Sequence, residues 1–383
     1  MLKIEKLEKR APVYDITVEK NENFYANGIL VHNCGEVSLT VTGGYCVIAD
    51  NVPFHAETLA EVFEAAKVTT RSLIRTNLMD CLYSHETKRT NRIGVGLTGV
   101  HEFAWKFFEV GFRHLINPDV ETASVLGPKI ARFHMSPSVR AGAFWLTLAE
   151  LSNAIVEEGI EYSKELGVNV PHTMLTVKPS GSVSKLFGLT EGWHLPAMEQ
   201  YLRWVQFRTD DPLVNNYKNA GYRWRELKTY SGTTIIGFPT QPVIGSLNMG
   251  EHLVTAHEAT PEEQYKWLQL GEKYWIKGGN ESGNDYGNQI SYTLKYDPKI
   301  VDFQHFLDML IKYQSVIRCC SVLPIADTSA YEYTPEEAVS KAEYEKLVHE
   351  IQAMNVKEDI GREHLDCGTG GCPIDFNEDK KGE

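Results

Sequence analysis

Alternating apolar and polar residues mark the first part of the chain as β-structure. Residues 3–7 and 13–18 follow the two-residue period of a half-buried strand. Asn27-Gly28, with short apolar stretches on both sides, is a strong signal for a tight β-hairpin. This region shows no helical period. Residues 1–33 therefore predict a short all-β segment that is too small to fold alone and must pair with another segment.

The pattern changes after residue 34, where helical and strand-like stretches alternate. Apolar residues at helical spacing predict helices at 57–77, 138–167, 262–276 and 335–354. Short apolar runs predict strands at 35–40, 43–48, 92–99, 176–184, 232–244, 288–294 and 318–323. Glycines in 92–99 indicate close approach of the backbone, and 176–184 ends in a loop of small residues. Strands that alternate with helices indicate an α/β barrel or an α/β layered sheet.

The composition is that of an ordinary globular protein, with 42% hydrophobic and 23% charged residues. The 383 residues allow two or three domains. No apolar run approaches the ~20 residues of a membrane span, and no signal peptide is visible after Met1. A net charge of −13 argues against a nucleic-acid-binding surface, and an anionic small substrate would need local donors. We therefore expect no membrane or nucleic-acid partner.

Seven cysteines stand at irregular positions along the chain. An odd number at irregular spacing favours reduced or catalytic thiols in a cytoplasm over the disulfide framework of a secreted protein. We take Cys81, Cys319 and Cys320 as structural.

Three reactive side chains follow one another at His32, Asn33 and Cys34, after the apolar run 29–31. An asparagine amide attacks its own backbone carbonyl and cleaves the chain as a succinimide, and a neighbouring histidine donates a proton to the departing amine. Cysteine is the strongest nucleophile among ordinary side chains. Taken alone, the triplet is more simply a chance sequence in a loop.

The surrounding sequence changes this interpretation. The strand at 13–18, the hairpin signal and the terminal His-Asn-Cys occur in order, and residues 12–34 resemble the last two motifs of an intein, the self-splicing element of the Hedgehog/intein family. One departure is Glu22, which stands where the family often has a histidine, so an assisting role of that histidine is missing here.

The intein resemblance implies a role for each reactive side chain. Cys34 attacks a thioester formed on a partner segment. Asn33 cyclises with His32 as the proton donor, and Asp15 is a supporting polar group. The first intein segment, with its own nucleophile, is expected on a separate polypeptide, so this chain would be the C-terminal half of a split intein. The alternative is that Met1 marks an artificial fragment boundary.

A thiol and a carboxylate lie at i and i+2 in Cys34-Gly35-Glu36, so they point to the same face of a strand. A carboxylate does not lower the pKa of a neighbouring thiol, so the pair does not suit an activated thiolate. It suits a thiol that reacts as a radical beside a general base.

Four motifs in this order resemble the C-terminal half of a ribonucleotide reductase large subunit: Cys34-Gly35-Glu36, the strand at 92–99, the loop Pro179-Ser180-Gly181-Ser182, and the closing Cys367-x4-Cys372. Details such as Gly43-Gly44-Tyr45-Cys46 are most similar to the monomeric adenosylcobalamin-dependent ribonucleoside-triphosphate reductases. The resemblance spans about residues 34–376. It implies the C-terminal part of a ten-stranded α/β barrel, adenosylcobalamin as cofactor and ribonucleoside triphosphates as substrates.

By this resemblance Cys34 forms the thiyl radical that abstracts the ribose 3′-hydrogen, and Glu36 acts as base on the 3′-hydroxyl. Cys46 is one of two thiols that reduce the 2′-position, and its partner lies in the other half of the enzyme.

The resemblance also implies a phosphate site and a redox tail. Ser180, Gly181 and Ser182 would hold the substrate phosphates through backbone N–H groups and hydroxyls. Cys367 and Cys372 would carry electrons from an external, thioredoxin-like reductant.

Plainer interpretations exist for several of these motifs. Cys46 on an apolar strand would ordinarily be a buried structural thiol, and the loop at 179–182 alone would be only a turn. Cys367 and Cys372 could form half of a zinc site, although no second pair stands at metal spacing, and we predict no metal site. The Asp-x-His-x-x-Gly signature of other cobalamin-binding families is absent, so the cofactor rests on the resemblance.

The two resemblances meet at Cys34. The reductase pattern is Asn-Pro-Cys-x-Glu, but His32 and Asn33 precede Cys34 here. We therefore expect splicing to remove residues 1–33 and to join a host segment ending in Asn-Pro to Cys34. That thiol would serve first in splicing and then as the radical. Before splicing the chain should be inactive as a reductase.

The expected organisation is an intein segment at 1–33, a reductase barrel segment at 34–354 and a flexible redox tail at 355–383. Two other functions stay open. The chain could be a complementation subunit that never splices, with its first segment as a docking arm. It could also be a thiol-disulfide oxidoreductase that uses the tail cysteines.

Overall fold

The computed structural model describes residues 23–26, 29–32, 47–81, 83–123, 135–178, 180–280, 286–318, 321–325 and 332–351. For residues 23–26, 29–32 and 182 it describes the backbone alone. The chain divides into two compact units. The first unit comprises the chain up to Glu199 together with Gln241–Asp327, and the second comprises Gln200–Thr240 together with the chain from Thr328 onward.

The hairpin predicted around Asn27-Gly28 is confirmed. Strands β1 (Asn23–Ala26) and β2 (Ile29–His32) pair antiparallel, with Ala26 opposite Ile29. The strands predicted at 3–7, 13–18 and 35–40 lie outside the described residues.

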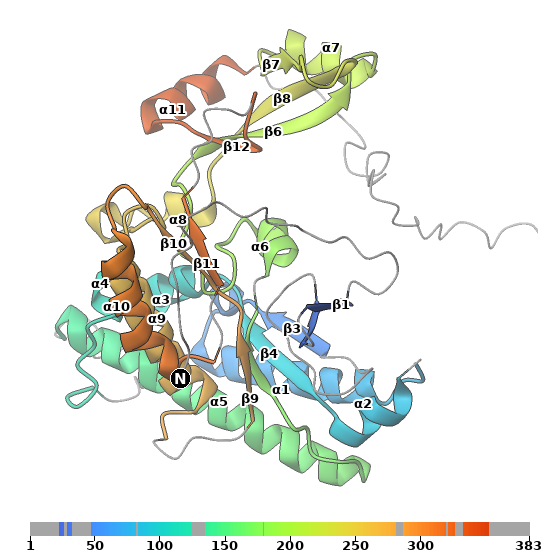
Figure 1. Ribbon diagram of the computed structural model, residues 1–383, viewed down its shortest axis with the longest axis vertical. Helices are drawn as coiled ribbons and strands as arrows, with labels where there is room; N and C mark the ends of the chain where they lie inside the picture. The colour runs from blue at the N-terminus through green and yellow to red at the C-terminus, as the bar shows by residue number, and fades with distance from the viewer. Residues whose placement is uncertain are drawn as a thin grey trace, which may run out of the picture. The chain divides into compact units, whose positions relative to one another are not determined.

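A parallel sheet lies at the centre of the first unit (Figure 1). Its strand order is β3 (Val47–Asn51), β4 (Ile93–Leu97), β5 (Leu175–Val177) and β9 (Gly287–Ile290), and each neighbouring pair is parallel. Every residue of β4 and β5 is buried. Parallel strands covered on both faces consist of near-continuous apolar residues, which is the pattern of these two strands.

Helices connect these parallel strands, as crossover connections require. Those between β3 and β4 are α1 (Leu59–Asn77) and α2 (Ser84–Thr90), and those between β4 and β5 are α3 (Val100–Phe108), α4 (Phe112–Leu115) and α5 (Pro137–Leu166). Side-chain caps fix where the two long helices begin: Thr58 accepts from Glu61 N and Ser136 from Val139 N. Helix α5 ends at Gly167, whose φ of 66° is left-handed.

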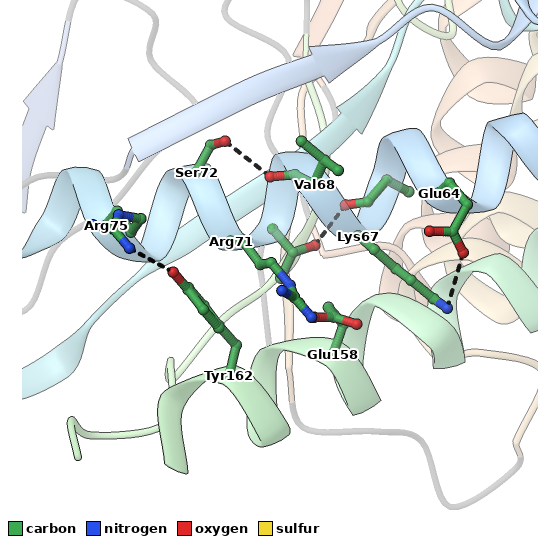
Figure 2. A network of polar contacts seen from close by, with 10 residues as sticks. Glu64, Lys67, Val68, Arg71, Ser72, Arg75, Glu158 and Tyr162 are labelled. Carbon is green, nitrogen blue, oxygen red and sulfur yellow. Dashed lines mark hydrogen bonds and ion pairs between the residues drawn. The ribbon is translucent and has the colours of Figure 1, made fainter. Parts of the chain in front are cut away.

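Helices α1 and α5 pack side by side, and polar side chains join them (Figure 2). The Arg71 Nε donates to Glu158 Oε1 at 2.5 Å, and the Arg75 Nη1 donates to the Tyr162 hydroxyl at 2.9 Å. The Glu158 side chain is only 9% exposed, so this ion pair is partly shielded from water. The two contacts link the second half of α1 to α5.

An aromatic cluster fills the core of the first unit. Four fully buried tryptophans belong to it, namely Trp145, Trp193, Trp267 and Trp275. Three of them donate their indole N–H to backbone carbonyls, at 2.7–3.0 Å. Buried indoles are stable where the N–H has such a partner.

The rest of the first unit consists of short elements around this core. They are η1 (Pro53–His55), α6 (Gly181–Phe187), α8 (Val243–Ser246), η3 (Gly250–His252), α9 (Pro261–Leu270), the π-helical turn η4 (Gly271–Ile276), β10 (Thr293–Tyr296), α10 (Phe303–Tyr313), η5 (Gln314–Val316) and β11 (Ser321–Pro324). Strands β10 and β11 form a separate parallel pair.

The second unit is built on an antiparallel sheet with the strand order β12-β6-β8-β7. Its elements are β6 (Tyr201–Arg208), α7 (Pro212–Asn219), β7 (Arg223–Glu226), β8 (Thr233–Thr240), β12 (Glu336–Ala338) and α11 (Lys341–Glu350). Two small apolar clusters stabilise it. One contains Trp204 and Leu347, and the other contains Tyr217 and Ile236.

The predicted α/β class is confirmed, and the structure adds that the central sheet is parallel. The ten-stranded barrel and the boundaries at residues 33 and 354 remain predictions. The helix predicted at 335–354 is wrong at its start, because Glu336–Ala338 pairs with β6 and the helix begins only at Lys341. The run 288–294 contains the ends of two strands rather than one. No described helix is long and apolar enough to cross a membrane.

Candidate functional site

The carboxyl ends of β3, β4 and β5 lie side by side, because the three strands are parallel neighbours. Ligands of open α/β sheets bind at this edge. Polar side chains gather here from two of the strands. Asp50 lies in β3, and Lys178 and Ser180 follow β5. This edge is the candidate site.

The Asp50 carboxylate is the centre of the cluster. Its Oδ2 accepts a 2.7 Å hydrogen bond from Lys178 Nζ, and its Oδ1 accepts a 2.7 Å hydrogen bond from Ser180 Oγ. The Asp50 side chain is 1% exposed and that of Lys178 is 21% exposed. A buried carboxylate is costly unless it is paired and hydrogen-bonded. Both of its oxygens meet that condition here.

Gly96 in the middle strand makes room for this contact, and Gly94 makes room for the apolar neighbours earlier along the strand. Gly96 pairs with Asp50 in the sheet register, and a Cβ on Gly96 would lie 3.1 Å from both Asp50 Oδ1 and Lys178 Cβ. A Cβ on Gly94 would lie 2.5 Å from Ile48 Cγ2. The Asp50–Lys178 ion pair therefore passes over β4 at Gly96, a position without a side chain. This confirms the close approach that the glycines predict.

The structure describes part of the predicted phosphate loop. Ser180 is 1% exposed with a left-handed φ of 59°, and its hydroxyl donates to Asp50. Gly181 begins α6, and a Cβ there would meet no atom within 4 Å. The predicted loop of small residues thus becomes a short helix. The Ser180 hydroxyl donates its hydrogen bond to Asp50 and is buried. A ligand that approaches this loop would therefore contact the backbone of Gly181, where there is open space.

A second buried carboxylate fixes the segment that follows α6. Glu102 is fully buried and accepts hydrogen bonds from Thr190 N at 2.8 Å and Thr190 Oγ1 at 2.6 Å. Burial raises the pKa of the Glu102 carboxyl, and the two hydrogen bonds from Thr190 oppose this shift. Thr98, just after β4, donates to Thr190 O and accepts from Gly192 N, both at 3.1 Å. The segment is thereby attached to the carboxyl end of β4.

His194 fixes the other end of this segment. Its Nε2 accepts a 3.0 Å hydrogen bond from Thr293 N, so Nδ1 carries the proton and lies 3.1 Å from Glu191 O. The ring stacks on Tyr292 with a centroid distance of 4.7 Å. Burial lowers the pKa of His194, which favours the neutral imidazole that these contacts require.

Apolar side chains border the same edge on α6. Leu186 is 79% exposed and Phe187 is 38% exposed. The His55 ring packs edge-on against Phe187 at 5.0 Å. Exposed apolar neighbours of this kind often mark a surface that contacts a ligand or partner. Within the described ranges, no cluster of three or more His, Cys, Asp or Glu side chains is arranged to hold a metal ion.

Most of the predicted catalytic and redox residues lie outside the described residues. These are Asp15, Asn33, Cys34, Glu36, Cys46, Cys367 and Cys372. His32 ends β2, where the backbone alone is described, and the chain enters β3 directly after Cys46. The roles of all these residues therefore remain predictions.

Sequence reasoning missed Asp50 and Lys178. A signal was present, because each charged residue stands at the end of a short apolar strand. Only the strand order shows that side chains 128 positions apart meet across β4.

Comparison with known proteins adds independent information. No protein-family model matches the chain. It is 28% identical over 358 residues to the adenosylcobalamin-dependent ribonucleoside-triphosphate reductase of Lactobacillus gasseri, a match that covers 89% of this chain and 44% of that protein. The protein of the same name from Lactobacillus leichmannii is 28% identical over 364 residues and is covered to 45%. The chain is similar to adenosylcobalamin-dependent ribonucleotide reductases.

A solved structure supports the fold. The crystal structure of a B12-dependent (class II) ribonucleotide reductase superposes with a TM-score of 0.65 and 24% sequence identity, covering 84% of this chain and 42% of that one. This likeness confirms the α/β fold with a parallel sheet. The chain spans less than half the length of the reductases that it matches. The named relatives confirm the predicted resemblance to reductases, and the resemblance of residues 12–34 to an intein remains a prediction.

Proposed function

We propose that this chain is the precursor of the C-terminal part of a ribonucleotide reductase, joined to an N-terminal part by protein trans-splicing. The observation that carries the reductase proposal is the similarity to named reductases over 89% of the chain. The described geometry supports it, because polar groups gather at the carboxyl edge of the parallel sheet, where α/β proteins bind ligands.

In the joined enzyme, a ribonucleoside triphosphate would be reduced by thiol chemistry. Cys34 as a thiyl radical abstracts the 3′-hydrogen, and Glu36 takes the proton of the 3′-hydroxyl. Cys46 and a partner thiol from the other polypeptide supply two electrons and form a disulfide, while the 2′-hydroxyl leaves as water. Cys367 and Cys372 reduce that disulfide by exchange, and a thioredoxin-like reductant restores them.

The substrate phosphates are proposed to bind at Ser180, Gly181 and Ser182. Open space beside Gly181 supports this placement, since a ligand can approach the backbone there. The Ser180 hydroxyl would act indirectly, because it holds Asp50.

Adenosylcobalamin is the proposed cofactor, as in the names of the relatives. The apolar surface on α6 fits a large group of this kind, because Leu186 and Phe187 are exposed at the carboxyl edge of the sheet. These two side chains would pack against the bound cofactor. When bound, it supplies the one-electron chemistry that generates the Cys34 thiyl radical.

Residues 1–33 are proposed to act as the C-terminal segment of a split intein. Cys34 attacks a thioester on the partner polypeptide, and Asn33 then cyclises with His32 as proton donor and Asp15 as a supporting group. An S-to-N acyl shift completes the peptide bond. The antiparallel β1–β2 hairpin directly before Asn33 supports this proposal.

Intact-mass measurement after co-expression with a matching N-terminal half tests the splicing. The parent chain should yield a ligated product whose second part begins at Cys34, and Asn33→Ala should abolish it. Asn117→Ala, at an exposed position of the first unit, is the control and should splice normally. If both chains keep their masses and still form an active reductase, residues 1–33 are a docking arm and the splicing proposal is wrong.

Turnover of ribonucleoside triphosphates by the joined protein tests the reductase. We expect deoxyribonucleotide formation that requires added adenosylcobalamin and a dithiol reductant. Cys34→Ala should abolish it when the two reductase parts are expressed already fused, without residues 1–33, so that the variant needs no splicing. Cys81→Ala removes an exposed thiol and should keep full activity. Absence of turnover in the correctly joined parent protein would refute the reductase function.

A further inference from the structure

We infer that Lys178 is a phosphate-contacting cation of this site and that Asp50 is its counter-ion when no ligand is bound. The inference rests on the proposed function for the nature of the ligand, a nucleoside polyphosphate. It adds a charged side chain to a loop for which only backbone groups and hydroxyls were predicted.

The exposure of the ion pair is asymmetric. The Asp50 side chain is 1% exposed and the Lys178 side chain is 21% exposed, so the lysine is the partner that a ligand from solvent can reach. Among the described residues, Asp50 is the one partner of Lys178 Nζ, at 2.7 Å. An ammonium group has three donors, so two are left for a second acceptor. The pair can therefore bind an anion without breaking apart.

The loop itself offers an anion little else. The Ser180 hydroxyl is buried against Asp50, and α6 has only 7 residues. The chain carries a net charge of −13, which repels a polyanion at long range. A local cation is needed to offset this repulsion. Lysine binds phosphate as a compact point charge, and Lys178 lies two residues before Ser180.

A nearby lysine provides a matched comparison. Lys185 on α6 pairs with Glu191 at 3.3 Å, and the two side chains are 34% and 40% exposed. A ligand that approaches this pair meets both charges equally. Lys185 should therefore contribute little to anion binding.

Titration calorimetry of the full 383-residue chain with inorganic tripolyphosphate at low salt tests the inference. Lys178→Met should weaken binding about tenfold or more, as expected from loss of a charge-assisted hydrogen bond. Lys178→Arg should keep most of the affinity, and Lys185→Met should change it less than about twofold. Asp50→Asn should bind as tightly as the parent or more tightly, because it removes a negative charge beside the ligand.

A double variant guards against misfolding. Lys178→Met alone leaves a buried carboxylate without its cation, whereas Asp50→Asn with Lys178→Met removes both charges and keeps an acceptor for Ser180. We expect the double variant to unfold at the parent's temperature and to have lost tripolyphosphate binding. Parent-like binding by the double variant would overturn the inference. So would an Asp50→Asn loss equal to that of Lys178→Met, or no binding by the parent.

These results separate the inference from the proposed function. If tripolyphosphate binding depends on Lys178 but the joined protein reduces no ribonucleotide, the anion site is supported and the reductase function is refuted. If the joined protein is an active reductase and Lys178→Met binds tripolyphosphate as the parent does, the reductase function is supported and the role of Lys178 is refuted.

Discussion

The two sheets of this protein place their charges in opposite ways. In the parallel sheet of the first unit, the Asp50–Lys178 pair lies against the sheet, with the carboxylate 1% exposed. In the antiparallel sheet of the second unit, Arg208 and Asp210 pair at 2.8 Å with side chains 84% and 71% exposed. A shielded pair must be complete and well placed, whereas an exposed pair contributes little to stability. The parallel sheet is therefore where a change in one residue should matter most.

Burial along the strands shows the same contrast. All residues of β4 are buried, whereas β6 alternates and three of the four residues of β7 are exposed. A strand enclosed on both faces has no room for an added atom. A strand with one open face can shift its side chains toward solvent. Single substitutions in each sheet should therefore differ in their cost.

Adding a methyl group should destabilise the parallel sheet more than the antiparallel one. In Gly94→Ala the new Cβ would lie 2.5 Å from Ile48 Cγ2, so we expect a loss of about 2–3 kcal/mol of unfolding free energy. In Gly237→Ala the Cβ would lie 3.0 Å from the buried Trp204 ring, a smaller overlap than at Gly94, and we expect a loss of about 1 kcal/mol. Urea denaturation followed by circular dichroism measures both.

Gly181→Ala is the control for this pair, because its Cβ meets no atom within 4 Å and alanine favours the helix that begins there. Its stability should equal or slightly exceed that of the parent. Equal losses in Gly94→Ala and Gly237→Ala would show that the two sheets tolerate added volume equally and would remove the contrast.

Acid should weaken the first unit through His101. This ring stacks on Trp267 at 5.1 Å, and burial lowers its pKa to about 4. The unfolded chain has the ordinary value near 6.5, so it binds a proton more readily than the folded state. The stability contributed by neutral His101 is present above pH 6.5 and is lost as the pH falls toward 4. His101→Phe keeps an aromatic ring and should flatten this part of the pH–stability curve.

Asp210→Asn provides the matched test in the second unit. Its pair with Arg208 lowers the pKa of the Asp210 carboxyl, but both side chains are exposed. We expect its pH–stability curve to follow that of the parent in thermal melts between pH 4 and 7. A curve for His101→Phe that also follows the parent would exclude His101 as a source of acid sensitivity.

The sequence predicted the elements whose signals are local. Helix α5 follows from its apolar spacing and ends at Gly167, and β4 follows from a short apolar run with glycines. Strand β12 was missed because Pro335 resembles a helix start, and only pairing with β6 makes Glu336–Ala338 a strand. The Asp50–Lys178 pair was missed because its two residues meet only through the pairing of strands that are far apart in the sequence. Contacts between distant segments decide such features, and one sequence does not show them.

The smallest predicted effect concerns a half-buried cation on the second unit, the Lys218 side chain, which is 21% exposed. Lys218 Nζ lies 3.6 Å from the ring centroid of Trp224, which is 47% exposed. Such a contact contributes roughly 0.5–1 kcal/mol, so Lys218→Met should lower the unfolding free energy by about 0.5 kcal/mol. Lys346→Met is the control, because its pair with Glu350 is exposed on both sides and should have almost no effect. A loss above about 2 kcal/mol in Lys218→Met would mean that charged side chains of the antiparallel sheet also stabilise its core. The two sheets would then not differ in how strongly their charged residues contribute to stability.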